Sequence, residues 1–203
     1  DDAGLEDCKI MASNSLDEYT ITSLLIQGGP IDIFGVGERL ITSKSDPVFG
    51  AVYKIASIEK DGMWEPRIKI SESVEKITNP GLKKVYRVYN DKGRAIADLL
   101  TLLREVPDTE EPYRYIDPEQ PWRELYFENC TFKEMKQLII KDGKLVVDLP
   151  TLEEIRAYVQ DQLANEIWPE EQRFENPHRH YLDMSPSYYQ LKMDLLNRIY
   201  RKK

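Results

Sequence analysis

The 203-residue sequence contains only two cysteines, Cys8 and Cys130, and only two histidines, His178 and His180. Two cysteines so far apart exclude a disulfide framework and a cysteine-rich zinc site. The histidines share one short run, NPHRH, and no cysteine or carboxylate stands at a helical spacing that would complete a metal site. We therefore expect a surface or hydrogen-bonded loop role for them, with no metal site and no catalytic residue in this chain.

Positive charge is also scarce, because 28 Lys and Arg face 36 Asp and Glu, giving a net charge of −8. Nucleic acids and anionic membranes need clustered cations, so we expect neither as a partner. No apolar run approaches the roughly 20 residues of a membrane span, and the start, DDAGLEDCKI, does not resemble a signal peptide. We expect a cytoplasmic location. The start has no Met and leads directly into a strand, which indicates a fragment of a longer protein.

The first 47 residues have a strand, helix, strand order. Residues 9–14 form a short apolar run, Ser15 and Glu18 have the spacing of a capping box, Gly-Gly-Pro at 28–30 ends the helix, and IDIF at 31–34 begins a second strand. A connection of this kind places the two strands parallel. We predict the α/β class, with this βαβ unit as the first of three parts.

The second part, residues 48–150, is rich in strand patterns. Three hairpins are predicted, at 48–59 with 66–71, at 83–89 with 94–100, and at 137–149 turning on Asp142-Gly143. Residues 104–122 are acidic and contain four prolines, so an extended connection with little regular structure is expected there.

The third part, residues 151–203, is predicted to be helical. Thr151 and Glu154 form a second capping-box pattern, and Ser185-Pro186 has the pattern of an N-cap followed by a first helical residue. Each helix has an apolar stripe that we expect to make core contacts. The stripes are Leu152, Ile155, Val159, Leu163 and Ile167 in the first helix, and Tyr188, Leu191, Leu195 and Ile199 in the second.

The Gly-x-Gly at Gly35 and Gly37, in FGVGERL, is not a dinucleotide fingerprint, because the third glycine and a capped helix directly after it are missing. Two glycines at the end of a parallel strand can still point backbone N–H groups at an anion. The preceding strand ends in ASNSLDE, so its loop would lie beside the glycines. From the residues alone, a plain turn and a two-loop phosphate or sugar site both remain open.

A longer succession of motifs is more specific. The ASN-x-LDE loop, GVG-x-x-LIT, G-x-VYK, KISE-x-VEKIT and R-x-ENPHR occur in one order between residue 8 and about residue 200. This order resembles the C-terminal part of the bacterial nicotinate phosphoribosyltransferase family. The resemblance implies the last strands of an irregular α/β barrel, an antiparallel β-rich segment and C-terminal helices.

The resemblance also implies a reaction of NAD salvage, in which nicotinate and phosphoribosyl diphosphate give nicotinate mononucleotide with ATP hydrolysis. ATP and Mg²⁺ are therefore expected for the complete enzyme, together with a homodimer, although no residue of this chain is identified as binding either cofactor. The family's phosphoacceptor histidine and nicotinate-binding residues lie upstream, so this chain alone is expected to be inactive.

What carries over to this sequence is the phosphate and ribose side of the site. Backbone N–H groups of Gly35, Val36 and Gly37 would hold the 5′-phosphate, and Ser13 and Asn14 would reach the phosphate or the ribose hydroxyls. Thr42 and Lys44 are further candidates for phosphate contacts. Many relatives have Thr where this chain has Glu38, and because a carboxylate repels phosphate we expect Glu38 to point away.

Two alternatives remain open at this stage. The chain can be a non-catalytic scaffold or oligomerisation module of the same fold. It can also belong to a related enzyme that uses nicotinamide or quinolinate, because the residues that select the pyridine are not in this sequence.

Overall fold

The computed structural model describes residues 4–48 and 50–201. The chain divides into two compact units, one up to Tyr53 and one from Lys54 onward. Helices combine with parallel and antiparallel strands, as the predicted α/β class requires. The finer division at residues 47 and 150 stays a prediction. No helix in the described part of the chain is both long and apolar enough to cross a membrane.

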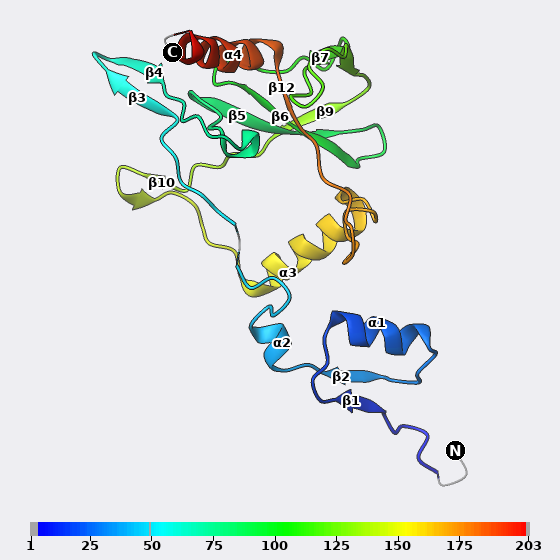
Figure 1. Ribbon diagram of the computed structural model, residues 1–203. Helices are drawn as coiled ribbons and strands as arrows, with labels where there is room; N and C mark the ends of the chain where they lie inside the picture. Colours follow the sequence, from blue (N-terminus) through cyan, green and yellow to red (C-terminus); the bar gives the residue numbers. More distant parts are fainter. Residues whose placement is uncertain (1–3, 49, 202–203) are drawn as a thin grey trace. The chain divides into compact units, whose positions relative to one another are not determined.

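The first unit contains the predicted βαβ arrangement (Figure 1). Its elements are β1 (Met11–Ser13), α1 (Glu18–Ile26), β2 (Ile33–Gly35) and the short helix α2 (Glu38–Ile41). β1 and β2 pair in parallel, with Ser13 opposite Gly35. The predicted parallel strands are thus confirmed, and their last residues lie side by side.

The predicted capping box at Ser15 is wrong. Asp17 is the N-cap of α1, and its Oδ1 accepts a hydrogen bond of 2.8 Å from the Thr20 N–H. Ser15 instead lies in a left-handed conformation with φ of 52°, one residue after Asn14 with φ of 83°. These two residues turn the chain from β1 into the helix.

The second unit is built on a four-stranded sheet in the order β12, β6, β5, β9 (Figure 1). Its strands are β5 (Lys83–Tyr89), β6 (Ala95–Leu102), β9 (Thr131–Glu134) and β12 (Leu182–Met184). β5 pairs antiparallel with β6 and β9, whereas β12 is parallel to β6. The predicted hairpin of β5 and β6 is confirmed.

The second unit also contains three two-stranded antiparallel sheets. A short 3-10 helix, η1 (Val74–Lys76), lies between β4 and β5 in the sequence. The pairs are β3 (Ser57–Lys60) with β4 (Met63–Pro66), β7 (Tyr113–Tyr115) with β8 (Leu125–Phe127), and β10 (Ile140–Lys141) with β11 (Lys144–Leu145). The first and last are predicted hairpins. Their turns, Asp61-Gly62 and Asp142-Gly143, have positive φ at both residues, as tight hairpins favour.

The expectation of little regular structure in 104–122 is wrong at β7. That strand pairs with β8, and the next residue, Ile116, forms an antiparallel bridge with Met184 of β12. The proline-rich segment is therefore tied to the edge of the main sheet.

The two faces of the sheet carry separate core clusters, because side chains alternate along each strand. One cluster comprises Tyr86, Val88, Ala97, Leu99, Phe127 and Cys130, and the other comprises Leu100, Met184 and Tyr188. Tyr188 belongs to α4 (Pro186–Tyr200), whose N-cap Ser185 accepts a hydrogen bond of 3.1 Å from the Tyr188 N–H. The predicted Ser185-Pro186 helix start is confirmed.

The other predicted helix is α3 (Leu152–Asp161), which continues into a π-turn, η2 (Gln162–Glu166). Its Thr151 and Glu154 capping box is confirmed. The predicted core contacts of its apolar stripe are not found among the described residues, because Leu152 is 73% exposed and Ile155, Val159 and Leu163 are also exposed.

Candidate functional site

The ends of β1 and β2 border a cavity of about 330 Å³. It is lined by Asn14, Ser15, Leu16, Gly35, Gly37, Glu38, Arg39 and Lys44. The loops meet because Ser13 and Gly35 are paired in parallel strands, so both loops leave the same edge of the sheet. The two loops that the sequence singles out therefore share one hollow.

Gly35 brings the two strand ends close together. A Cβ at this position would lie 3.2 Å from the Ser13 Cβ, closer than side-chain carbons normally approach. At Gly37, by contrast, an added Cβ would meet no atom of the described chain within 4 Å. A side chain there would occupy space at the cavity without a clash.

The structure gathers four of the seven predicted site residues, Asn14, Gly35, Gly37 and Lys44, around this cavity. Ser13 lies beside them at the end of β1. Val36 lines a neighbouring hollow of about 350 Å³, on which Lys44 also borders.

Thr42 is not among the residues that line either hollow. Its hydroxyl donates a hydrogen bond of 2.7 Å to the Glu38 carbonyl, at the end of α2. This contact satisfies the donor of Thr42 within its own helix. The phosphate contact of Thr42 stays a prediction, and it would require this hydrogen bond to be exchanged.

Arg39 lines the cavity and was not expected from the sequence. Its guanidinium forms an ion pair with Asp17, the N-cap of α1. Hydrogen bonds from Thr20, together with the charge of Arg39, lower the pKa of Asp17. The signal in the sequence is a helix-capping aspartate after the first strand and a cation two residues after the Gly-x-Gly of the second strand, because the pairing of these strands brings the two residues together.

Glu38 lines the cavity too, contrary to the expectation that it points away. Its side chain is 75% exposed, and its Oε1 lies 3.7 Å from Lys44 Nζ. The carboxylate is thus solvated and partly neutralised by the cation beside it. The cavity carries two cationic side chains and one carboxylate.

The histidines lie in the second unit. His178 packs edge-on against Tyr181, and His180 Nδ1 lies 2.9 Å from Glu171 Oε1. The other ring nitrogen, His180 Nε2, lies 3.5 Å from Asp98 Oδ1, within ion-pair distance. The predicted loop role is confirmed for His180 by its contact with Glu171. No group of three or more potential ligands that could hold a metal ion occurs within the residues that the structure describes.

Asp98 and His180 shift each other's ionisation. Burial alone would raise the pKa of Asp98, but His180 and the two-pronged contact from Arg87 lower it to about 2. The pKa of His180 is raised, first by Asp98 and then by Glu171, since both carboxylates favour the imidazolium form.

We expect His180→Gln to lower the free energy of unfolding by about 1 kcal/mol at mildly acidic pH, the value of a charge-assisted contact. A histidine with a raised pKa stabilises the folded state fully below its unfolded pKa, and this contribution is lost as the pH rises through the folded pKa. Urea unfolding across this range measures the effect. His178→Gln is the matched control, and equal losses in both variants at every pH would contradict the assignment.

Residues 82–192 match the family described as the nicotinate phosphoribosyltransferase C-terminal domain. The chain belongs to the nicotinate phosphoribosyltransferase family. It is 37% identical over 200 residues to the nicotinate phosphoribosyltransferase of Bacillus subtilis strain 168, covering 98% of this chain and 41% of that protein. To the Caenorhabditis elegans nicotinate phosphoribosyltransferase it is 35% identical, with 91% of this chain and 32% of that protein covered.

A solved structure has the same fold. The crystal structure of human nicotinic acid phosphoribosyltransferase superposes with a TM-score of 0.72 at 24% sequence identity, over 95% of this chain and 34% of the human chain. The chain thus spans about a third to two fifths of the length of these nicotinate phosphoribosyltransferases.

Proposed function

We propose that the protein to which this chain belongs is a nicotinate phosphoribosyltransferase, which makes nicotinate mononucleotide from nicotinate and phosphoribosyl diphosphate. Within it, this chain would hold the ribose 5′-phosphate. The observation that carries the proposal is the cavity shared by the loops after β1 and β2, with Lys44 and Arg39 beside the glycine backbone. The family membership of the chain supports the reaction.

The chemistry of the cavity suits a phosphate monoester. Glycine backbone at Gly35 and Gly37 allows an anion to approach N–H groups closely. The Asn14 amide can donate to a phosphate or ribose oxygen, and Lys44 adds a positive charge. Charge stabilisation of this local kind needs no basic protein surface.

Glu38 defines what must change when phosphate binds. Its Oε1 lies 3.7 Å from Lys44 Nζ, so the carboxylate and an incoming anion would compete for the same ammonium group. Because the Glu38 side chain is largely solvated, it can leave the cavity at low cost while Lys44 exchanges the carboxylate for the phosphate.

We further propose that β1 and β2 are strands of an irregular α/β barrel. Two parallel strands are rarely stable alone, since parallel sheets are normally covered on both faces. In the described part of the first unit, Leu16 is the buried hydrophobic residue, and α1 has none. Other strands of the complete protein would cover these faces.

The remaining elements of the proposal rest on the family. ATP coupling and a homodimer are expected for the complete enzyme, and Mg²⁺ would accompany the diphosphate. The residues described here offer no cluster that fits a metal ion, so no step is assigned to Mg²⁺ in this chain. A cytoplasmic location agrees with Cys8 and Cys130, both of which are free thiols.

The phosphate site can be tested through the product. In the complete protein, we expect Lys44→Gln to weaken binding of nicotinate mononucleotide about fivefold, the loss of one charge-assisted contact. Binding of the nucleoside without the phosphate should not change. Glu38→Gln should have the opposite effect on the mononucleotide, because it removes the competing carboxylate. Isothermal titration calorimetry measures both ligands.

Lys9→Gln is the control, since Lys9 is an exposed lysine of the same unit that does not line the cavity. If Lys44→Gln and Lys9→Gln bind the mononucleotide equally well, or if Lys44→Gln weakens the nucleoside to the same extent, the phosphate assignment fails.

A further inference from the structure

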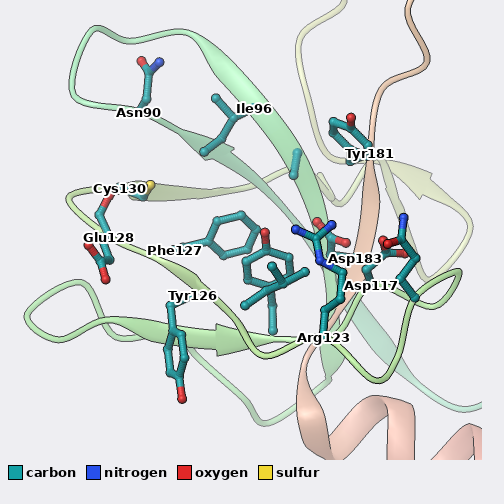
Figure 2. A pocket seen from close by; sticks show the side chains of 14 residues that line it. Asn90, Ile96, Asp117, Arg123, Tyr126, Phe127, Glu128, Cys130, Tyr181 and Asp183 are labelled. Atoms are coloured by element: carbon teal, nitrogen blue, oxygen red, sulfur yellow. Dashed lines mark hydrogen bonds between the residues drawn. The ribbon is translucent and has the colours of Figure 1, made fainter.

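A second cavity, of about 560 Å³, lies in the unit that begins at Lys54 (Figure 2). Its charged lining residues are Asp117, Asp183, Glu128 and Arg123. Three carboxylates and one guanidinium give the lining an excess of acidic side chains. The phosphate site proposed above uses none of these residues.

Asp183 is the key residue of this cavity, because it is buried and no residue in the described part of the chain donates a hydrogen bond to its carboxylate. Its side chain faces away from the neighbouring Met184, which packs with Leu100 and Tyr188 on the opposite face of the sheet. The residue is 5% exposed, yet it lines the cavity. Burial and charge, without any hydrogen bond, determine the ionisation of its carboxylate, whose oxygens are not among the fully enclosed unpartnered atoms and so open onto the cavity. A buried carboxylate without donors is costly, and a ligand that supplies donors removes that cost.

The charged groups around Asp183 act on one another. Burial, and then the charge of Asp117, raise the pKa of Asp183 to about 7, whereas His180 acts in the opposite direction. Tyr115 also has a raised pKa, caused by burial and then by Asp183, with Arg123 opposing. Figure 2 shows Asp117, Arg123 and Asp183 together at one side of the cavity. Two carboxylates thus face the same space.

Aromatic rings form another part of the wall. Tyr115 stacks on Phe127, with ring centroids 3.9 Å apart and planes 12° from parallel. Tyr126 and Tyr181 also line the cavity. Rings attract flat molecules and, through their negative faces, cations.

We propose that this cavity binds a small planar organic cation whose amidinium or guanidinium type of group donates hydrogen bonds to Asp183 and Asp117, while its flat part lies against the tyrosines. A planar group with several N–H donors matches carboxylate oxygens in pairs. Arg123 lines the same cavity and would repel a cation. It carries no hydrogen bond to Asp183 in the structure, which leaves that carboxylate to the ligand.

The probe is benzamidine, a ring with an amidinium group, and benzamide is its neutral counterpart. In calorimetric or NMR titrations of the complete protein, we expect benzamidine to bind at least tenfold more tightly than benzamide. Asp183→Asn should weaken benzamidine about tenfold and Asp117→Asn about threefold, whereas Arg123→Gln should tighten it, as expected for charges in a partly buried site. Asp148→Asn, at an exposed aspartate outside the cavity, should bind like the wild type.

The pH dependence provides a separate readout. Only an ionised Asp183 attracts the cation, so with a pKa of about 7 binding should weaken about tenfold between about pH 8 and pH 6. Asp117 and His180 act on the charge of Asp183, and Asp183 in turn acts on Tyr115, which Arg123 also influences. Asp183→Asn should remove most of the change. Equal binding of benzamidine and benzamide, wild-type affinity in Asp183→Asn, or no binding of benzamidine at about 10 mM would overturn the proposal.

Discussion

Replacing Tyr188 by alanine is expected to lower the free energy of unfolding by about 4 kcal/mol, the usual cost of deleting a fully buried aromatic side chain. Tyr188 is 0% exposed and packs with Leu100 and Met184 between α4 and the sheet. Its hydroxyl donates a hydrogen bond of 2.9 Å to the Pro80 carbonyl. Truncation would therefore open a cavity and leave a buried acceptor without its partner.

Two variants separate these causes. Tyr188→Phe keeps the ring and loses the hydrogen bond, so a loss of about 1 to 2 kcal/mol is expected. Tyr200→Ala, at a residue of the same helix that is 56% exposed, should cost less than about 1 kcal/mol. Urea unfolding measures all three, and a Tyr188→Ala protein no less stable than Tyr200→Ala would refute this view of the core.

Asp183→Asn is expected to stabilise the protein at alkaline pH, by about 2 to 3 kcal/mol near pH 8. The folded-state pKa of Asp183 is raised from 3.8 to about 7, first by burial and then by Asp117. The folded protein then binds more protons than the unfolded chain between these values, so its stability falls as the pH rises. The whole pKa shift corresponds to about 4 kcal/mol of unfolding free energy. The gain in Asp183→Asn is smaller, because the buried asparagine amide has hydrogen-bonding groups without partners.

The sign of this effect is measured by unfolding at two pH values. Near about pH 4 the buried carboxyl is protonated in the folded state, so only the cost of the asparagine amide remains and Asp183→Asn should be less stable than the wild type by about 1 to 2 kcal/mol. Asp148→Asn, at an exposed aspartate, should show no such dependence on pH. A difference between the wild type and Asp183→Asn that is the same at both pH values would exclude a raised pKa as its cause.

Local signals predicted those parts of the fold that local contacts decide. The Thr151 and Glu154 capping box, the Ser185-Pro186 helix start and the Asp142-Gly143 turn each depend on residues within four positions of one another. The capping box at Ser15 failed because Asp17, two residues later, is an equally good cap, and the chain first turns through left-handed residues.

Contacts between distant segments were not visible in the sequence. β7 has three residues within an acidic, proline-rich segment, and its partner β8 supplies the pairing. The spacing of apolar residues in α3 correctly predicted a helix. The same spacing does not determine whether another element packs on the apolar face, and this face is exposed in the structure.

The candidate sites divide in the same way. A βαβ unit predicts that two strand-end loops are neighbours, and Asn14, Gly35 and Gly37 do line one cavity, while their contact with phosphate stays a prediction. Arg39 was missed because its position depends on the ion pair with Asp17. A single aspartate in LDM has no pattern that would mark Asp183, since its burial arises only when β12 joins the sheet.

The position of β12 also determines the order in which the second unit can assemble during synthesis. β5, β6 and β9 have been synthesised once the chain reaches Glu134. The second edge of β6 has no partner until β12, Leu182–Met184, has been synthesised much later. Until then β6 is an edge strand whose unpaired backbone groups can recruit other chains. Pairing over such a sequence separation is slow to close. A nascent chain that has not yet left the ribosome beyond Met184 is therefore the form of this unit most exposed to aggregation and to chaperone binding.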